Sequence, residues 1–178
     1  MFKVFGFYKF IKIKSLKRNK DILQKFISSN NIRGTIIISK EGLNGTISGH
    51  IKDIDITIKK LKSLFLFKHF DNNNSSKSKF QPFQKPKIKI KKEVVPMNLI
   101  LNSRERNTKS HLNPKEWNEL IKDKDTYIID TRKPFEHKVG TFKKSVNPNV
   151  NNFRDFPKYL NKLQKNNPVA MFCTGGIR

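Results

Sequence analysis

The first half of the chain carries strand and helix patterns in an order that few folds satisfy. Period-two alternation and β-branched runs indicate strands, whereas apolar residues spaced three and four apart indicate helices. These patterns predict strands over 2–13, 35–38, 46–48 and 88–95, and helices over 21–30 and 51–66. We predict a turn over 41–45 and a polar connector over 71–79. The resulting β-α-β-β-α-β order predicts an α+β ferredoxin-like domain.

A sheet of this kind has one face covered by its helices and one open face. An open face with lysines and aromatic residues is a common platform for RNA. We assign Phe5, Phe7 and Phe26 instead to the core, because their spacing is that of buried residues. The lysines between Lys85 and Lys92 fit either a solvated edge strand or contacts to RNA phosphates, and the sequence leaves both open.

The second half alternates strands with helices, which predicts an α/β domain with a parallel sheet. Asn113 is an expected N-cap, with Pro114 at the first helical position. Buried strands are predicted over 127–130 and 169–172, a loop-rich segment over 130–142 and a helix over 153–163. Sites in such folds lie at the carboxyl ends of the strands.

The only cysteine, Cys173, directly follows the last predicted strand, and the chain ends Cys173-Thr174-Gly175-Gly176-Ile177-Arg178. The two glycines allow backbone N–H groups to turn inward, and Arg178 adds a positive charge. Such a loop favours a thiolate and predicts that Cys173 is a nucleophile. The alternative is a structural cysteine. Cysteine phosphatases have one more residue in the loop, so the spacing C-x-x-x-x-R favours sulfur chemistry.

The composition is strongly basic, with a net charge of +24 over 178 residues. Residues 1–97 hold 22 of the 38 Lys and Arg residues but only 6 of the 14 Asp and Glu residues. This charge favours a polyanionic partner, although a lysine-rich codon bias would also produce it. A lone cysteine fits a reducing cytoplasm, and no apolar stretch reaches the length of a membrane span, so we expect no membrane association.

Several motifs together resemble one family. Ile129-Asp130-Thr131-Arg132, Phe135-Glu136, Gly140-Thr141-Phe142 and the Cys173–Arg178 loop resemble a rhodanese domain. Glu41-Gly42-Leu43-Asn44-Gly45-Thr46, Pro82-Phe83 and Trp117-Asn118 narrow the resemblance to the rhodanese-like tRNA uridine hydroxylases.

This resemblance implies oxygen-dependent conversion of wobble uridine in tRNA to 5-hydroxyuridine. Molecular oxygen is then a co-substrate, the cofactor is unknown, and Cys173 is the active-site cysteine, by rhodanese analogy a persulfide carrier. Asp130, Arg132 and Glu136 are expected to support the site by an internal ion pair. The alternatives are a sulfurtransferase that carries a Cys173 persulfide and a non-catalytic basic RNA-binding module.

The domain boundaries follow from these patterns. We predict a ferredoxin-like, tRNA-binding domain over 1–97, a linker over 98–111 and a rhodanese-like domain over 112–178. The last has about 70 residues, where a domain usually has 100 or more, so we expect an inactive fragment truncated after the active-site loop. The four histidines show no ligand spacing, so we predict no metal site, and no stable protein partner is predicted.

Overall fold

The computed structural model describes residues 1–97, 111–163 and 166–177 and divides the chain into two compact units. The first unit holds Met1–Val95, and the second begins at Pro96. Most of the predicted linker, residues 98–110, lies outside the described residues. Within the described ranges, no helix is both long enough and apolar enough to cross a membrane.

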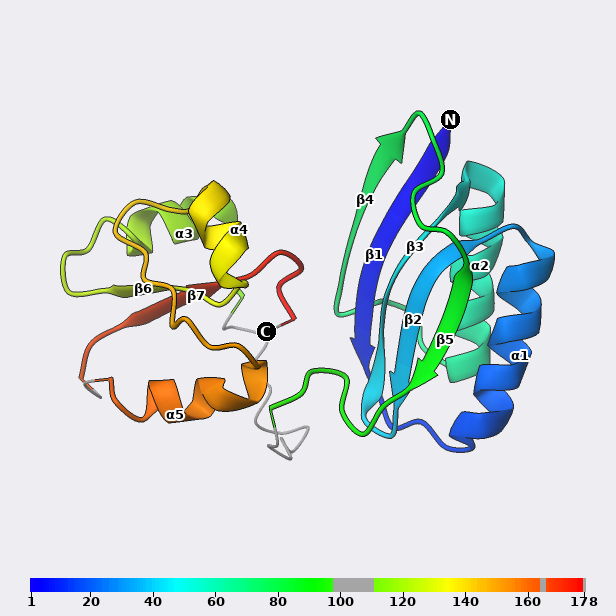
Figure 1. Cartoon of the computed structure of the whole chain (residues 1–178), viewed down its shortest axis with the longest axis horizontal. Helices are drawn as coiled ribbons and strands as arrows, with labels where there is room; N and C mark the ends of the chain where they lie inside the picture. The colour runs from blue at the N-terminus through cyan, green and yellow to red at the C-terminus, as the bar shows by residue number, and fades with distance from the viewer. Residues whose placement is uncertain (98–110, 164–165, 178) are drawn as a thin grey trace. The chain divides into compact units, whose positions relative to one another are not determined.

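The first unit is a five-stranded sheet with two helices on one face (Figure 1). Its elements are β1 (Phe2–Phe10), α1 (Leu16–Ser29), β2 (Arg33–Ser39), β3 (Gly42–His50), α2 (Ile51–Phe65), β4 (Asn72–Ser78) and β5 (Pro86–Ile90). The strands lie in the order β4-β1-β3-β2-β5, and all neighbours are antiparallel except β2 and β5. The first four strands have the ferredoxin-like order, which confirms the predicted fold class.

The fourth strand of this fold is not the one that the sequence predicted. β4 forms from the polar segment predicted as a connector, and the strand predicted over 88–95 becomes β5, a fifth strand at the opposite edge. Nearly all of β4 is exposed, so it lacks the alternation of buried apolar residues by which strands are recognised. The exposed charge of Lys77 on β4 also disfavours pairing of this sheet edge with other chains.

Two other boundaries differ from the prediction. The helix expected from Asp21 begins five residues earlier, at Leu16, and β3 already begins at Gly42 inside the predicted turn. The glycines of this segment allow neighbouring strands to approach closely. A Cβ on Gly42 would lie 2.2 Å from the carbonyl oxygen of Lys9, and one on Gly45 would lie 3.0 Å from the ring of Phe7.

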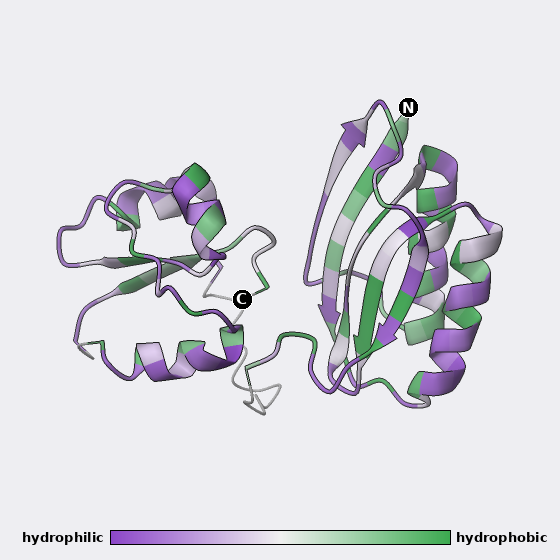
Figure 2. Cartoon of the chain, in the orientation of Figure 1, coloured by the Kyte–Doolittle hydropathy of each residue, from purple (hydrophilic) through white to green (hydrophobic). Residues whose placement is uncertain are grey.

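The core of the first unit lies between the sheet and the two helices. Its fully buried helical residues include Leu23, Ile27, Ile54 and Leu61, which meet strand residues such as Ile36, Ile38, Leu43 and Ile47. Phe5 and Phe7 belong to this core, as predicted, and Phe26 packs half-buried at its edge. Figure 2 shows apolar residues on the strands and polar residues on the outer sides of the helices.

The second unit contains a pair of short parallel strands flanked by short helices (Figure 1). Its elements are α3 (Pro114–Leu120), β6 (Tyr127–Asp130), α4 (Pro134–Val139), a 3₁₀ turn at Phe153–Asp155, α5 (Phe156–Leu160) and β7 (Val169–Phe172). Val146 adds an isolated parallel bridge to Ile129.

The sequence predictions for this unit are confirmed in part. The Asn113 side chain accepts hydrogen bonds from the N–H groups of Lys115 and Glu116, and the Glu116 carboxylate accepts one from Asn113 N, which completes a capping box. The loop-rich segment contains α4, and the helix predicted over 153–163 is a 3₁₀ turn followed by α5. β7 was expected to be buried, but its Met171 is 43% exposed.

We predict that Gly34→Ala destabilises the first unit by about 2–3 kcal/mol. Gly34 has φ of 121°, and a Cβ there would lie 2.2 Å from the backbone oxygen of Thr46. The control is Gly6→Ala, whose Cβ would crowd only the end of the flexible Asn74 side chain and would meet Thr46 at an ordinary contact distance of 3.8 Å. The free energy of urea unfolding, followed by far-UV circular dichroism, compares the two variants. An equal loss of unfolding free energy in both variants would contradict this explanation.

Candidate active site

The candidate site begins with Asp130, the last residue of β6, whose side chain is fully buried. Arg132 binds it through two parallel hydrogen bonds, from Nε to Oδ1 at 2.9 Å and from Nη2 to Oδ2 at 2.7 Å. The backbone N–H of Arg132 also donates to Oδ1, and the Thr141 hydroxyl donates to Oδ2 at 2.9 Å. A buried carboxylate needs this many donors, because burial without them would favour its neutral form.

The guanidinium of Arg132 extends this network to two other segments. Its Nη2 donates to the carbonyl oxygen of Gly140 at 2.6 Å, and its central carbon lies 5.4 Å from the ring centroid of Phe172. Asn147 Nδ2 donates to the backbone oxygens of both Asp130 and Arg132. The pair therefore joins the end of β6, the residues after α4 and the end of β7.

These contacts set the pKa values of the two charged groups. Burial by itself would raise the pKa of Asp130, but hydrogen bonds from Arg132 and Thr141 outweigh it and hold that pKa below its ordinary value. The pKa of Arg132 is raised, mainly by its hydrogen bond to Asp130 and further by the negative charges of Asp130 and Glu136. Arg132 thus stays cationic close to Cys173.

Cys173 follows β7 and is a half-buried free thiol. Its position is fixed from the neighbouring strand, because Thr131 donates to the carbonyl oxygen of Phe172 from both its N–H, at 3.0 Å, and its hydroxyl, at 2.8 Å. Cys173 lines a cavity of about 360 Å³ together with Arg132, Thr141, Phe142 and Thr174. A thiol is thus placed in a cavity beside a fixed guanidinium.

The loop after Cys173 is held by α4. The Thr174 hydroxyl donates to Glu136 Oε1 at 2.9 Å, and the other carboxylate oxygen of Glu136 accepts from the backbone N–H of Lys133. Gly176 has φ of 67°, a conformation that favours glycine, and a Cβ on Gly175 would meet no neighbour. Ile177 is half-buried, and Arg178, the expected cation of the loop, lies outside the described residues.

The structure brings Asp130, Arg132, Glu136 and Cys173 around one part of the second unit. The ion pair joins Asp130 to Arg132, whereas Glu136 holds Thr174. Sequence reasoning assigned no role to Thr141 or Asn147. Thr141 stands in the Gly140-Thr141-Phe142 motif, which could have indicated it, whereas nothing in the sequence singles out Asn147.

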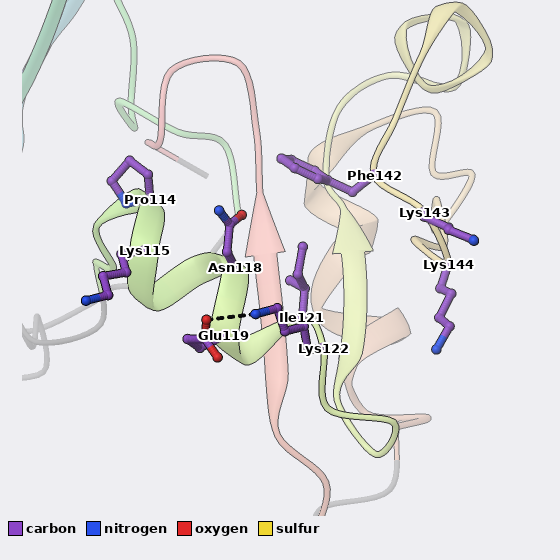
Figure 3. A pocket seen from close by; sticks show the side chains of 9 residues that line it. All are labelled: Pro114, Lys115, Asn118, Glu119, Ile121, Lys122, Phe142, Lys143 and Lys144. Atoms are coloured by element: carbon purple, nitrogen blue, oxygen red, sulfur yellow. Dashed lines mark hydrogen bonds and ion pairs between the residues drawn. The ribbon is translucent and has the colours of Figure 1, made fainter.

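Three aromatic rings form the wall beside the cavity. Phe142 packs against Phe172, with ring centroids 4.9 Å apart, and against Trp117 of α3 at 5.4 Å. On another side Phe142 lines a second cavity of about 650 Å³ with residues of α3 (Figure 3). In that view Lys122 pairs with Glu119, and the side chains of Lys143 and Lys144 extend outward rather than into the cavity.

Among the described residues, no group of three His, Cys, Asp or Glu side chains could hold a metal ion. Because this finding concerns the described residues only, the absence of a metal site stays a prediction from the sequence.

Comparison with known proteins identifies the class of protein to which this chain belongs. The family model of the UPF0176 acylphosphatase like domain matches residues 2–94, and that of the rhodanese-like domain matches residues 113–178. Cys173 thus lies in the region that the rhodanese-like model matches. Since the first model covers more than half of its length, the chain belongs to the UPF0176 family.

A curated relative supports the same assignment. The chain is 64% identical over 178 residues to a protein of Pelagibacter ubique (strain HTCC1062) named tRNA uridine(34) hydroxylase. The match covers all of this chain and 59% of the relative, so the chain spans about three-fifths of that protein's length.

Solved structures resemble the first unit only weakly. An acylphosphatase from Coxiella burnetii is 11% identical, with a TM-score of 0.36. The match covers 49% of this chain and 90% of the acylphosphatase chain. An acylphosphatase from Bacillus subtilis is 9% identical, with a TM-score of 0.37, over 49% of this chain and 98% of its own. The fold assignment rests on the strand order described above.

We predict that Asp130→Asn lowers the free energy of unfolding by about 2 kcal/mol at neutral pH, because it weakens charged hydrogen bonds. The folded pKa of Asp130 lies below its unfolded value of about 3.9, so the contribution is complete above about pH 5. It is lost as the pH falls through the folded pKa. Urea unfolding of wild type and variant should therefore differ most at pH 7, and the difference should shrink below pH 4.

The control for this experiment is Asp125→Asn, at an exposed aspartate of the same unit. It should unfold like the wild type throughout the pH range. A difference between wild type and Asp130→Asn that grows in acid would contradict the assigned sign.

Proposed function

We propose that the protein hydroxylates the wobble uridine of tRNA with molecular oxygen as co-substrate. One oxygen atom enters the hydroxyl group that replaces the C5 hydrogen, and the other leaves as water with two electrons and two protons from an external two-electron donor. The observation that supports this most is the 64% identity to the Pelagibacter protein, in a match that spans all 178 residues of this chain and so includes the region around Cys173. The rhodanese-like match over the same region and the cavity that Cys173 shares with Arg132 agree with it.

In this proposal each site residue has a separate task. Cys173 is the reactive group that faces the bound uridine. Arg132 keeps a positive charge beside it, and Asp130, which also accepts a hydrogen bond from Thr141, fixes the position of Arg132. Glu136 holds the loop through Thr174, while Gly175, Gly176, Ile177 and Arg178 complete the loop around the sulfur. A loop held in place before the substrate arrives costs less to organise during the reaction.

The remaining parts of the proposal concern the partner. A net charge of +24 suits a polyanion such as tRNA, and its excess in residues 1–97 favours the first unit as the tRNA-binding domain. The rhodanese-like domain over 112–178 then supplies the reactive site. Since tRNA is its substrate, we infer a cytoplasmic protein.

We predict that Cys173→Ser abolishes 5-hydroxyuridine formation in a strain that lacks its own tRNA uridine hydroxylase. The strain is complemented with the complete gene that encodes this chain or with the same gene carrying Cys173→Ser, and its tRNA nucleosides are analysed by mass spectrometry. Serine keeps the size of the side chain but removes the thiolate nucleophile. The control is Lys124→Gln, an exposed site away from the cavity, which should restore the nucleoside like the wild type.

Two results would contradict the proposal. Unchanged 5-hydroxyuridine with Cys173→Ser would remove the thiol from the reaction. A wild-type gene that restores a thiolated nucleoside, in which sulfur replaces oxygen, would favour a sulfurtransferase instead.

A further inference from the structure

The sheet of the first unit has a second face, turned away from α1 and α2. It is formed by every second residue of the five strands, beginning with Phe2, Arg33, Gly42, Asn72 and Lys87, and we call it the open face. A Cβ on Gly6 would meet the side chains of Asn74 and Thr46, which shows that residues of three neighbouring strands share this face.

Charge on the open face has one sign. None of these strand positions, all of which the structure describes, is an aspartate or glutamate, whereas Arg33, Lys87 and Lys89 are all exposed there. The acidic residues of this unit lie instead on the two helices and in turns and connecting segments. Some of them are paired with other lysines, as Asp55 is with Lys3 and Asp71 with Lys9. The face therefore complements a polyanion.

A segment beside this face exposes two aromatic rings. The segment 79–85 is tied to β3, because the Ser48 hydroxyl donates to the carbonyl oxygen of Pro82 at 2.6 Å and Gln81 Nε2 donates to Ser48 O at 3.0 Å. Phe80 is 71% exposed and Phe83 is 43% exposed, the latter with φ of 72°. Exposed phenylalanines held next to cations are suited to stack on unpaired bases.

Most of the remaining exposed positions carry amides and hydroxyls, and one carries the imidazole of His50. Asn72, Asn74 and Ser76 of β4 and Thr46 of β3 are exposed on the same face. Such groups can both donate and accept hydrogen bonds, as recognition of unpaired base edges requires. Duplex RNA buries those edges, so this chemistry favours a single-stranded segment.

We propose that the open face and the segment 79–85 bind an unpaired segment of RNA. Arg33, Lys87 and Lys89 contact its phosphates, and Phe80 and Phe83 stack on its bases. The identification of this RNA as a tRNA loop rests on the proposed function, but binding itself does not require hydroxylation.

The test measures fluorescence anisotropy of the purified chain with a labelled RNA stem-loop and with a fully paired RNA duplex of equal length. Arg33→Gln/Lys87→Gln/Lys89→Gln should lower the slope of log K against log salt by about 2, since each single-strand phosphate contact contributes about 0.7. The matched control is Lys17→Gln/Arg18→Gln/Lys25→Gln on α1, which removes the same charges from exposed positions of a helix on the other face. It should leave the slope unchanged.

Phe80→Ala/Phe83→Ala should weaken binding of the stem-loop by about tenfold or more, with the salt slope and duplex binding unchanged. The control is Phe135→Ala, another exposed phenylalanine, which should bind like the wild type. Circular dichroism checks that every variant is folded.

Three results would overturn the proposal. They are an equal fall of the salt slope in the two triple variants, an equal affinity of the wild type for the stem-loop and the duplex, or phenylalanine variants that change the sedimentation coefficient of the protein but not its RNA binding. The last would assign the surface to a second copy of the chain. Because the assay detects no modified nucleoside, its failure is distinct from failure of the proposed hydroxylation.

Discussion

The ion pair between Asp130 and Arg132 connects the segments from which the candidate site is built. Asp130 ends β6, Arg132 reaches the Gly140 carbonyl and the Phe172 ring, and Cys173 follows that ring in the chain. The pair also has the features that make a buried ion pair favourable, since its bonds are bidentate and Thr141 and a backbone N–H supply further donors. The position of the thiol depends on these contacts.

The same pair has an electrostatic consequence. Arginine keeps its charge in a partly buried position where lysine would tend to lose it, and its planar group matches a carboxylate with two bonds. Arg132 therefore remains a cation close to Cys173 at any physiological pH. Its partner Asp130 balances the charge within the unit, and the cavity is left with a thiol, a guanidinium and aromatic walls.

The two units have different physical character. The first has a continuous apolar core under two amphipathic helices, with fully buried apolar residues from α1, β2, β3 and α2. The second has two short strands, and its exposed apolar side chains include Met171 and Val169 of β7. In our proposals the first unit binds unpaired RNA through its open face, and the second unit holds the reactive thiol.

Sequence patterns were sufficient to predict helices and strands in which buried residues alternate with exposed ones. Phe5 and Phe7 indicated β1, and Asn113 with Pro114 indicated the start of α3. The same patterns failed to predict β4, a strand that forms through backbone pairing alone. The Asn and Ser residues of β4 become a strand only because β1 offers a free edge, and no local signal reports a distant edge.

Site residues could likewise be predicted only where a local motif contains them. Cys173, Asp130 and Arg132 stand in compact motifs, so the sequence indicated them. Asn147, by contrast, contributes through bonds to the backbone oxygens of residues 15 and 17 positions away, which only the folded chain brings together.

The most direct test is incubation of the purified product of the complete gene with unmodified tRNA and an electron donor under isotopically heavy oxygen gas, followed by mass analysis of the wobble nucleoside. The account predicts 5-hydroxyuridine that carries one heavy oxygen atom in the wild-type reaction and none with Cys173→Ser. A hydroxyl oxygen derived from water, or equal incorporation with the serine variant, would contradict it.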